Sequence, residues 1–554
     1  MKKITFILLA LVASVLSGKA QVLYNIVHEC DTTVKAKLSG ISLGSRAVKH
    51  IVYEYPSTDA DGQEVTVSGI IMIPSDVLDG TQPCDGVVMY NHYTIGSPSD
   101  APSVGGAGLD PVSIALASPL KPNYVIVASD YIGFGSSIDH NLSYICGDTN
   151  ARNSLDGLLA ARQLFEDRQV PQGKFLFNLG YSQGGTESMY AARLTDTEAK
   201  YKDIRFDKTF SGGGALDFEK IFTIYIENDD CEDLADVVLM ITSVNENYHL
   251  GIPYDVIFKE PIASKALEYF QTKNKGVMSA IGVMSMDKVS QVLQPEFMDF
   301  ESEPAKKFMA KLKEISITNG WEPDVTKQYY LAHSRHDNYV PIQSGRGMIT
   351  WMKENGFTSS LIPGKTSLQT NTAIFKLNHQ QAGIVWVIQS LAAIQFWPVL
   401  YYEGEQNRYY HDVVKDMNLL KVIKTLESLG IDLRKIVNGE GLSRAQLPTH
   451  YTLFDLIPNI SDYLSKVDLT TDDLEEMCED AGITIVDLAQ AYGYIQTGED
   501  PYAVPETEGE SAEGRITPEE RIEAPLYLLR SYEQQLAAWF LLGGYDVNYS
   551  LWGM

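Results

Sequence analysis

The segment KFLFNLGYSQGG, residues 174–185, restricts the possible folds of this chain more than any other part of the sequence. It opens with a short apolar run typical of a strand buried on both faces, and residues 186–193 favour a helix. Between the two, Gly180 and Gly184 flank Ser182 at a spacing that suits a sharp turn, because glycine tolerates such crowding. The segment therefore predicts a nucleophilic serine on a strand-to-helix turn, although the same pattern also occurs in ordinary tight turns.

Apolar strands and helical segments alternate on both sides of this turn. A helical pattern covers residues 154–165, and further strand candidates lie at residues 50–55, 64–74, 86–92, 124–130, 207–214, 328–333 and 372–377. Such alternation is typical of an α/β fold in which helices cover both faces of a parallel sheet. We therefore predict an α/β protein with a mostly parallel, doubly wound sheet.

The alternation lapses between residues 215 and 319, where the sequence pattern is helical. A helical insertion at this point of such a fold is expected to form a lid over the site. Within it, Met278, Met284 and Met286 could line a groove for a flexible apolar ligand, since methionine adapts to varied shapes. The more usual role of such residues is to form the core of the insertion itself.

These patterns divide the chain of 554 residues into successive parts. We expect a signal peptide (1–20), an N-terminal segment (21–47), a catalytic α/β core in two pieces (48–214 and 320–400), a helical lid (215–319) and a helical, acidic C-terminal region (401–554). No chemistry follows from the C-terminal pattern. Within this region, residues 478–485 resemble residues 426–433, but the two segments are too short to establish a repeat.

The first residues have the layout of a secretory signal. Lys2 and Lys3 precede an apolar run over residues 4–16, and small and polar residues then lead to Ala20, after which we expect cleavage. The run is shorter than the ~20 apolar residues that span a bilayer. We therefore expect a secreted or periplasmic protein without stable membrane insertion, and the net charge of -28 argues against nucleic acid as a partner.

Metal and redox chemistry have little support in the sequence. The five cysteines allow at most two disulfides, whose pairing the sequence does not determine, and none has the spacing of a metal or redox pair. His333 and His336 lie near Asp337, but a strand end and loop there would not give the geometry of a metal site. We therefore expect no metal and no other cofactor.

A serine hydroxyl needs an imidazole to take its proton, and the imidazole needs a carboxylate to fix its tautomer. With a strand-to-helix serine, the expected order along the chain is Ser, acid, His, each at the end of a strand. Asp337 follows the strand candidate at 328–333, and His379 follows that at 372–377. We therefore predict that Ser182, Asp337 and His379 are catalytic, the alternatives being a turn aspartate and a structural histidine.

The negative charge that develops in acyl transfer needs two backbone N–H donors. The N–H of Gln183 is one candidate, because it follows the serine directly. The other is expected from the loop after the strand that ends at His92, which makes Tyr93 or Thr94 the second candidate.

At these residues the sequence resembles the secretory lipase family of α/β-hydrolases, which comprises fungal secreted lipases and bacterial esterase relatives. The resemblance covers residues 48–400 and rests on Ser68-Gly69 with the following IIMIP, Ala101-Pro102-Ser103, Asp130-Tyr-x-Gly133, the turn at Ser182, Trp321-x-Pro323 and residues 337–341. It implies the α/β-hydrolase fold, a helical lid, Ser182 as nucleophile with Asp337 and His379 as partners, and ester hydrolysis without a cofactor. Gln183 and the long C-terminal region depart from the family's pattern.

We therefore expect an esterase or lipase that acts on a small-molecule ester or lipid through an acyl-enzyme on Ser182. A serine exopeptidase on the same fold is an alternative, because it would use the same three residues. A binding or assembly protein with a vestigial hydrolase domain is another, against which the intact order of Ser, Asp and His argues. The sequence does not predict the oligomeric state.

Overall fold

A computed structural model describes residues 22–38, 41–118, 121–357, 368–371 and 377–396, together with the pairs 442–443 and 495–496. The two pairs form a small parallel sheet, β10 (Leu442–Ser443) with β11 (Ile495–Gln496). The predicted signal peptide and almost all of the predicted C-terminal region lie outside the described residues.

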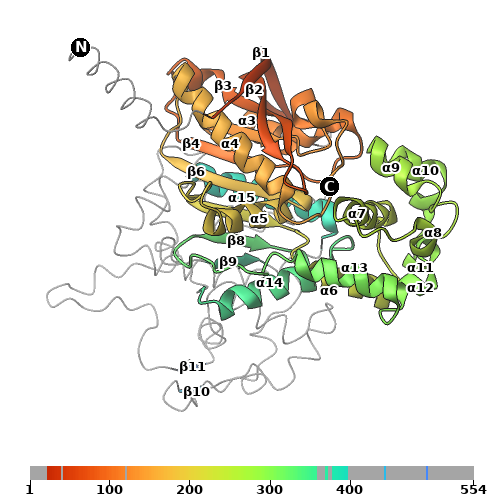
Figure 1. Ribbon diagram of the computed structural model, residues 1–554. Helices are drawn as coiled ribbons and strands as arrows, with labels where there is room; N and C mark the ends of the chain where they lie inside the picture. Colours follow the sequence, from red (N-terminus) through yellow and green to blue (C-terminus); the bar gives the residue numbers. More distant parts are fainter. Residues whose placement is uncertain are drawn as a thin grey trace, which may run out of the picture.

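A nine-stranded sheet forms the centre of the described chain (Figure 1). In spatial order its strands are β1 (Asn25–Leu38), β2 (Ile41–Thr58), β3 (Glu64–Pro74), β5 (Tyr124–Ser129), β4 (Gly86–Asn91), β6 (Phe175–Tyr181), β7 (Lys208–Gly212), β8 (Tyr329–Ala332) and β9 (Leu368–Asn371). The first three strands and the β3–β5 pair are antiparallel, and every pair from β5 to β9 is parallel. The predicted mostly parallel sheet is therefore confirmed.

Helices cover both faces of this sheet. Their bounds are α2 (Ser75–Leu78), α3 (Asp110–Ala117), α4 (Thr149–Arg168), α5 (Gln183–Thr197), α6 (Phe218–Asn228), α7 (Leu234–Asn247), α8 (Tyr254–Ile257), α9 (Ala266–Thr272), α10 (Gly276–Ala280), α11 (Val289–Val292), α12 (Pro295–Met298), α13 (Glu303–Glu314), α14 (Ile342–Glu354) and α15 (His379–Phe396). One apolar core contains buried residues of α4, α5 and α14, and a second contains buried residues of α3 and α15.

Strand β4 contributes to both cores, which explains its sequence. Val87 and Met89 belong to the core with α4 and α5, whereas Val88 and Tyr90 belong to the core with α3 and α15. Successive side chains of a strand point to opposite faces, so both sets are apolar and all six residues of β4 are buried. Each large apolar side chain buried in this way stabilises the fold by ~1.5–3 kcal/mol.

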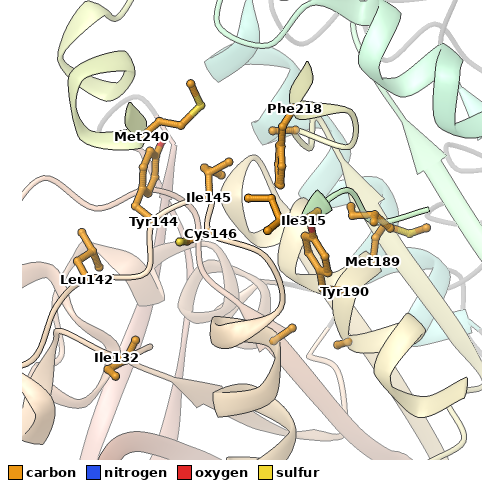
Figure 2. Close-up of a cluster of buried hydrophobic side chains, with 14 of the residues drawn as sticks. Ile132, Leu142, Tyr144, Ile145, Cys146, Met189, Tyr190, Phe218, Met240 and Ile315 are labelled. Atoms are coloured by element: carbon orange, nitrogen blue, oxygen red, sulfur yellow. The ribbon is translucent and has the colours of Figure 1, made fainter. Parts of the chain in front are cut away.

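The insertion, as we call residues 215–319, carries helices α6 to α13, most of which gather at one side of the molecule (right in Figure 1). It packs directly on the sheet-covering helices. Figure 2 shows Tyr190 of α5 beside Ile315, and the Tyr190 hydroxyl donates a hydrogen bond to the Ile315 carbonyl. The prediction that this stretch is helical is correct. Of its methionines, Met278 is fully buried in the core and Met286 packs against that core, which is the more usual role expected from the sequence, whereas Met284 is exposed.

The sheet differs from the prediction at its two edges. It begins before residue 48, because β1 and the start of β2 lie within residues 21–47. Exposed side chains in β1 alternate for the most part with half-buried ones, and only Val34 and Ala36 among its described side chains are buried, so its apolar pattern is weak. At the other edge the described sheet ends with β9, over residues 368–371, and the predicted strand at 372–377 lies outside the described residues except for Leu377.

The described cysteines are free thiols: Cys30, Cys84, Cys146 and Cys231. Burial raises the pKa of the Cys146 thiol to about 12, so this thiol stays protonated and unreactive at neutral pH. Cys478 lies outside the described residues.

Candidate active site

Ser182 lies between β6 and α5, in the turn that the sequence predicts. Its backbone angles, φ 57° and ψ -125°, are costly for a residue with a side chain, and such strain persists only where the surroundings impose it. A Cβ atom on Gly180 would lie 2.0 Å from the Gly184 carbonyl oxygen, and one on Gly184 would lie 2.1 Å from the Asn91 carbonyl oxygen. Both glycines are therefore needed for β6, α5 and β4 to approach one another at this turn.

The structure brings Ser182, His379 and Asp337 together. Nε2 of His379, the first residue of α15, lies 2.8 Å from the Ser182 hydroxyl oxygen. Nδ1 of the same ring lies 2.6 Å from a carboxylate oxygen of Asp337. Ser182, more than 150 positions from both partners in the sequence, thus forms one continuous hydrogen-bonded chain with them at the carboxyl ends of β6 and β8.

The carboxylate of Asp337 is enclosed by donors. One oxygen accepts hydrogen bonds from the backbone N–H groups of Tyr339 (3.0 Å) and Val340 (2.7 Å), and the other lies 3.4 Å from Nε2 of His333. Burial alone would raise the pKa of Asp337, but the hydrogen bonds from His333 and His379 outweigh it and hold the pKa well below its usual range. Asp337 is therefore ionised throughout the physiological pH range.

An ionised carboxylate only accepts hydrogen bonds, so Nδ1 of His379 carries the proton in this pair. Nε2 is then free to accept the hydroxyl proton of Ser182. Two aromatic rings hold the imidazole in place: Tyr339 stacks on it with centroids 5.1 Å apart, and Tyr181 lies tilted against it at the same distance. The Tyr181 hydroxyl also donates a 2.6 Å hydrogen bond to the His379 carbonyl.

The candidate oxyanion donors lie on two elements around Ser182. Gln183 is the first residue of α5, and the first N–H groups of a helix have no intrahelical partner. In the loop after β4, Nδ1 of His92 donates to the Tyr93 carbonyl at 2.7 Å. Because C=O and N–H point in opposite directions across a trans peptide, this bond directs the Thr94 N–H away from His92.

Three segments on which the family resemblance rests meet at Asp130. One carboxyl oxygen of Asp130 accepts a 2.5 Å hydrogen bond from the Ser68 hydroxyl, and the other accepts a 2.7 Å bond from the Ser103 N–H. Burial raises the pKa of Asp130 to about 6 against the effect of these two partners. These contacts fasten the loops after β4 and β5 to β3, so the motif residues position the site from a distance.

Two cavities reach Ser182. The larger, of about 660 Å³, lies between α3, α15 and the loop after β4, and the smaller, of about 60 Å³, lies under α6 and α7. Both are mainly apolar. Side chains common to both are Thr94, Ser182, Asp233, Asp236 and Tyr339.

Sequence reasoning missed the charged group at this junction. Lys275 places its ammonium 2.5 Å from Asp233 and 3.0 Å from Asp236. Burial raises the pKa of Asp236 to about 6, a shift that Lys275 opposes and Asp233 reinforces. Asp233 caps α7 and Asp236 lies in its first turn, a spacing that brings the two side chains close together, but no sequence pattern links them to Lys275, which directly precedes α10. His333, considered only as a metal ligand, proves to be a partner of Asp337.

Within the described residues, no group of three or more His, Cys, Asp or Glu side chains could hold a metal ion. The same part of the chain contains no helix that is both long and apolar enough to cross a membrane.

Comparison with known proteins shows the fold. No family model and no curated protein matches this sequence. Among solved structures, a candidate hydrolase from Legionella pneumophila aligns with a TM-score of 0.55 at 17% identity over 69% of this chain and 99% of its own. The rice cell wall degrading esterase LipA from Xanthomonas oryzae aligns with a TM-score of 0.54 at 18% identity over the same shares. The chain therefore has the α/β-hydrolase fold, in agreement with the resemblance seen in its sequence.

Proposed function

We propose that this protein is an exported serine hydrolase that cleaves carboxylic esters. The observation that carries the proposal is the chain of hydrogen bonds from the Ser182 hydroxyl through His379 to Asp337, at 2.8 Å and 2.6 Å. The strained backbone of Ser182 supports it, because strain of this kind is characteristic of functional positions. Export is proposed from the signal-like layout of residues 1–20.

In the proposed mechanism, the Ser182 oxygen attacks the ester carbonyl carbon while Nε2 of His379 takes the hydroxyl proton. The carbonyl oxygen becomes negatively charged and accepts hydrogen bonds from two backbone N–H groups. His379 then gives its proton to the leaving alcohol oxygen, the bond between carbon and that oxygen breaks, and the acyl group remains on Ser182. Water, activated by the same imidazole, releases the acid and restores the serine.

For the two N–H donors we propose Gln183 and Thr94. Gln183 begins a helix, where backbone N–H groups and the helix dipole both favour negative charge. The bond between His92 and the Tyr93 carbonyl supports Thr94 over Tyr93, because it fixes the peptide that carries the Thr94 N–H. Thr94 also lines both cavities beside Ser182, whereas Tyr93 lines only the larger.

The neighbour from Xanthomonas oryzae is an esterase, which by analogy favours esters over amides for this chain as well. A serine exopeptidase would use the same three side chains. In a binding protein that had lost its activity, the strained backbone of Ser182 would lower stability without contributing to function, so this observation argues against that alternative.

The test is hydrolysis of a chromogenic ester series by the wild type and Ser182→Ala. We expect the substitution to lower kcat by ~10⁴-fold or more, because the nucleophile itself is removed. Ser264→Ala, at an exposed serine of the insertion, is the matched control and should retain full activity. Matched amide substrates separate the alternatives: amide turnover without ester turnover would favour the exopeptidase, and no Ser182-dependent turnover of either would contradict the proposal.

A further inference from the structure

We infer that the two cavities at Ser182 divide the ester between them, with a short acyl group in the small cavity and a bulky, uncharged alcohol in the large one. This inference rests on the proposed function, because it assumes that Ser182 attacks an ester. It names the class of substrate, which the fold alone does not determine.

The position of His379 decides which part of the ester lies in which cavity. The imidazole must give its proton to the leaving alcohol oxygen, so that oxygen has to come within hydrogen-bond reach of Nε2. His379 lines the large cavity and is absent from the lining of the small one. The alcohol therefore extends into the large cavity.

The position of Gln183 indicates where the acyl chain lies. This residue, a candidate oxyanion donor, lines the small cavity and not the large one. The two substituents of the attacked carbonyl carbon point away from each other, so the acyl chain extends opposite the alcohol. The small cavity is the space on that side of Ser182.

The volume of the small cavity limits the acyl chain. A space of ~10–15 Å³ on this measure holds one water-sized group, so about 60 Å³ accepts roughly four to six such groups. Its lining includes Met240, Phe218, Tyr144 and Ile145, which Figure 2 labels within a cluster of buried side chains. These side chains are buried and well packed, so a longer chain would have to displace them. An acyl group of two to four carbons has three to five heavy atoms when its carbonyl oxygen is included, so the cavity fits acyl groups of about this length.

The large cavity fits a different kind of group. Its volume of about 660 Å³ is typical of pockets that enclose a whole drug-sized molecule. Ile114, Ile384 and Leu391 contribute apolar walls, so the alcohol is largely apolar. Its acidic and basic side chains, apart from His379 of the site itself, are three carboxylates, Asp110, Asp233 and Asp236, and one ammonium, Lys275. A carboxylate or phosphate on the alcohol would meet this excess of negative charge and bind poorly.

Two series of esters test the assignment on the full chain. In the first, 1-naphthyl esters vary from acetate to palmitate, and we expect kcat/KM to be highest between acetate and butanoate and at least tenfold lower at octanoate. In the second, acetates vary from methyl to 1-naphthyl, and we expect kcat/KM to rise with the size of the alcohol. An anionic naphthyl acetate, which carries a sulfonate, should react more slowly than the neutral one.

Substitutions in each cavity provide a second readout. Met240→Ala and Val237→Ala enlarge the small cavity, so each should move the acyl optimum to longer chains. Met284→Ala is the matched control, since this methionine of the same insertion is exposed and lines neither cavity. Ile384→Trp narrows the large cavity and should reduce turnover of naphthyl acetate while sparing methyl acetate.

The outcomes are distinguishable. The assignment would be reversed if the optimum lay at long acyl chains, if Met240→Ala and Val237→Ala left that optimum unchanged, and if Ile384→Trp abolished it. That result would overturn the inference but would not contradict the proposed ester hydrolysis. Absence of Ser182-dependent turnover on every ester would instead overturn the proposed function, and the inference with it.

Discussion

At the scale of single residues, Asp337 is the group whose environment is most fully specified. Two backbone N–H groups hold one carboxylate oxygen, and His379 and His333 approach the other. This arrangement fixes the tautomer of His379 as well as the ionisation of Asp337. The role proposed for Asp337 is therefore electrostatic and orientational, and it does not require the carboxylate to accept the proton.

The substitution Asp337→Asn tests this role. The amide N–H₂ of asparagine would donate to Nδ1 of His379, so the imidazole would place its proton on Nε2, where it cannot accept from Ser182. We expect kcat to fall by ~10³- to 10⁴-fold with little change in KM. Steady-state kinetics on a short-chain ester measures this.

Asp287→Asn, at an exposed aspartate of the insertion, is the control and should behave as the wild type. A loss of less than tenfold in Asp337→Asn would contradict the role proposed for the carboxylate.

The three residues of the candidate site could be predicted from sequence because their order and positions after strands follow from the chemistry of the turn. The structure adds contacts that the order of these residues along the chain does not predict. His333 contacts Asp337 only because of the loop geometry after β8, and Lys275 meets Asp233 and Asp236 only through the packing of the insertion. Contacts of this kind depend on tertiary structure and leave no local pattern.

At the scale of elements, the turn between β6 and α5 depends on close approach of three backbones. Gly180 faces the Gly184 carbonyl, Gly184 faces the Asn91 carbonyl of β4, and the Ser182 N–H donates a 2.8 Å hydrogen bond to the Gly212 carbonyl of β7. The turn is thus held by the strands on both sides of β6. A side chain at either glycine would force these backbones apart.

We therefore expect Gly184→Ala to destabilise the protein by ~1–3 kcal/mol and to lower activity, because its Cβ would lie 2.1 Å from a backbone oxygen. Gly347→Ala in α14 is the matched control. A Cβ there meets only a side-chain atom at 3.8 Å, and alanine favours helix, so this variant should be as stable as the wild type or slightly more stable. Urea unfolding measures both; equal stability of the two variants would refute the account of the turn.

The elements that sequence predicted best are those with the simplest environment. The predicted bounds of β3 match the structure, and those of β4 and β5 differ by one residue, because these strands are almost wholly buried and read as continuous apolar runs. β1 has exposed residues in alternation with mostly half-buried ones and carries several charges, and β9 contains a single apolar residue among its four. Edge strands depend on their pairing partner more than on their own composition.

At the scale of the whole molecule, carboxyl groups buried beside the site link stability to pH. Burial raises the pKa of Glu187, in α5, to about 8, although Asn150 donates a 3.2 Å hydrogen bond to it. The folded protein therefore keeps Glu187 protonated at neutral pH, whereas in the unfolded chain this carboxyl ionises above its ordinary pKa of 4.5. Burial also raises the pKa of Asp130, to about 6, so this carboxyl keeps its proton in the folded protein up to a lower pH than Glu187 does.

The sign of the effect follows from linkage. A raised folded pKa gives stability that is fully present below the unfolded pKa and is lost as pH rises toward the folded value. The contribution of Glu187 should therefore decline between about pH 4.5 and pH 8, by up to ~1.4 kcal/mol for each pH unit. Asp337 has the opposite sign, because its pKa is lowered: its contribution is present at neutral pH and is lost only in acid.

Glu187→Gln removes the titrating group, so we expect its free energy of unfolding to fall less steeply than that of the wild type between pH 5 and pH 8. Urea unfolding at four pH values measures the slope. Glu227→Gln, at an exposed glutamate of α6, should retain the slope of the wild type. If Glu187→Gln showed the slope of the wild type too, Glu187 would not be held protonated in the fold.

The central claim is that Ser182 is a nucleophile activated by His379, and covalent labelling tests it most directly. A fluorophosphonate reacts with an activated serine by losing fluoride and forms a stable serine ester. After incubation of the full chain with this reagent, mass spectrometry of the peptides should find a single adduct, on Ser182, and none in His379→Ala. Labelling of another serine in preference to Ser182, or no labelling at all, would contradict the account.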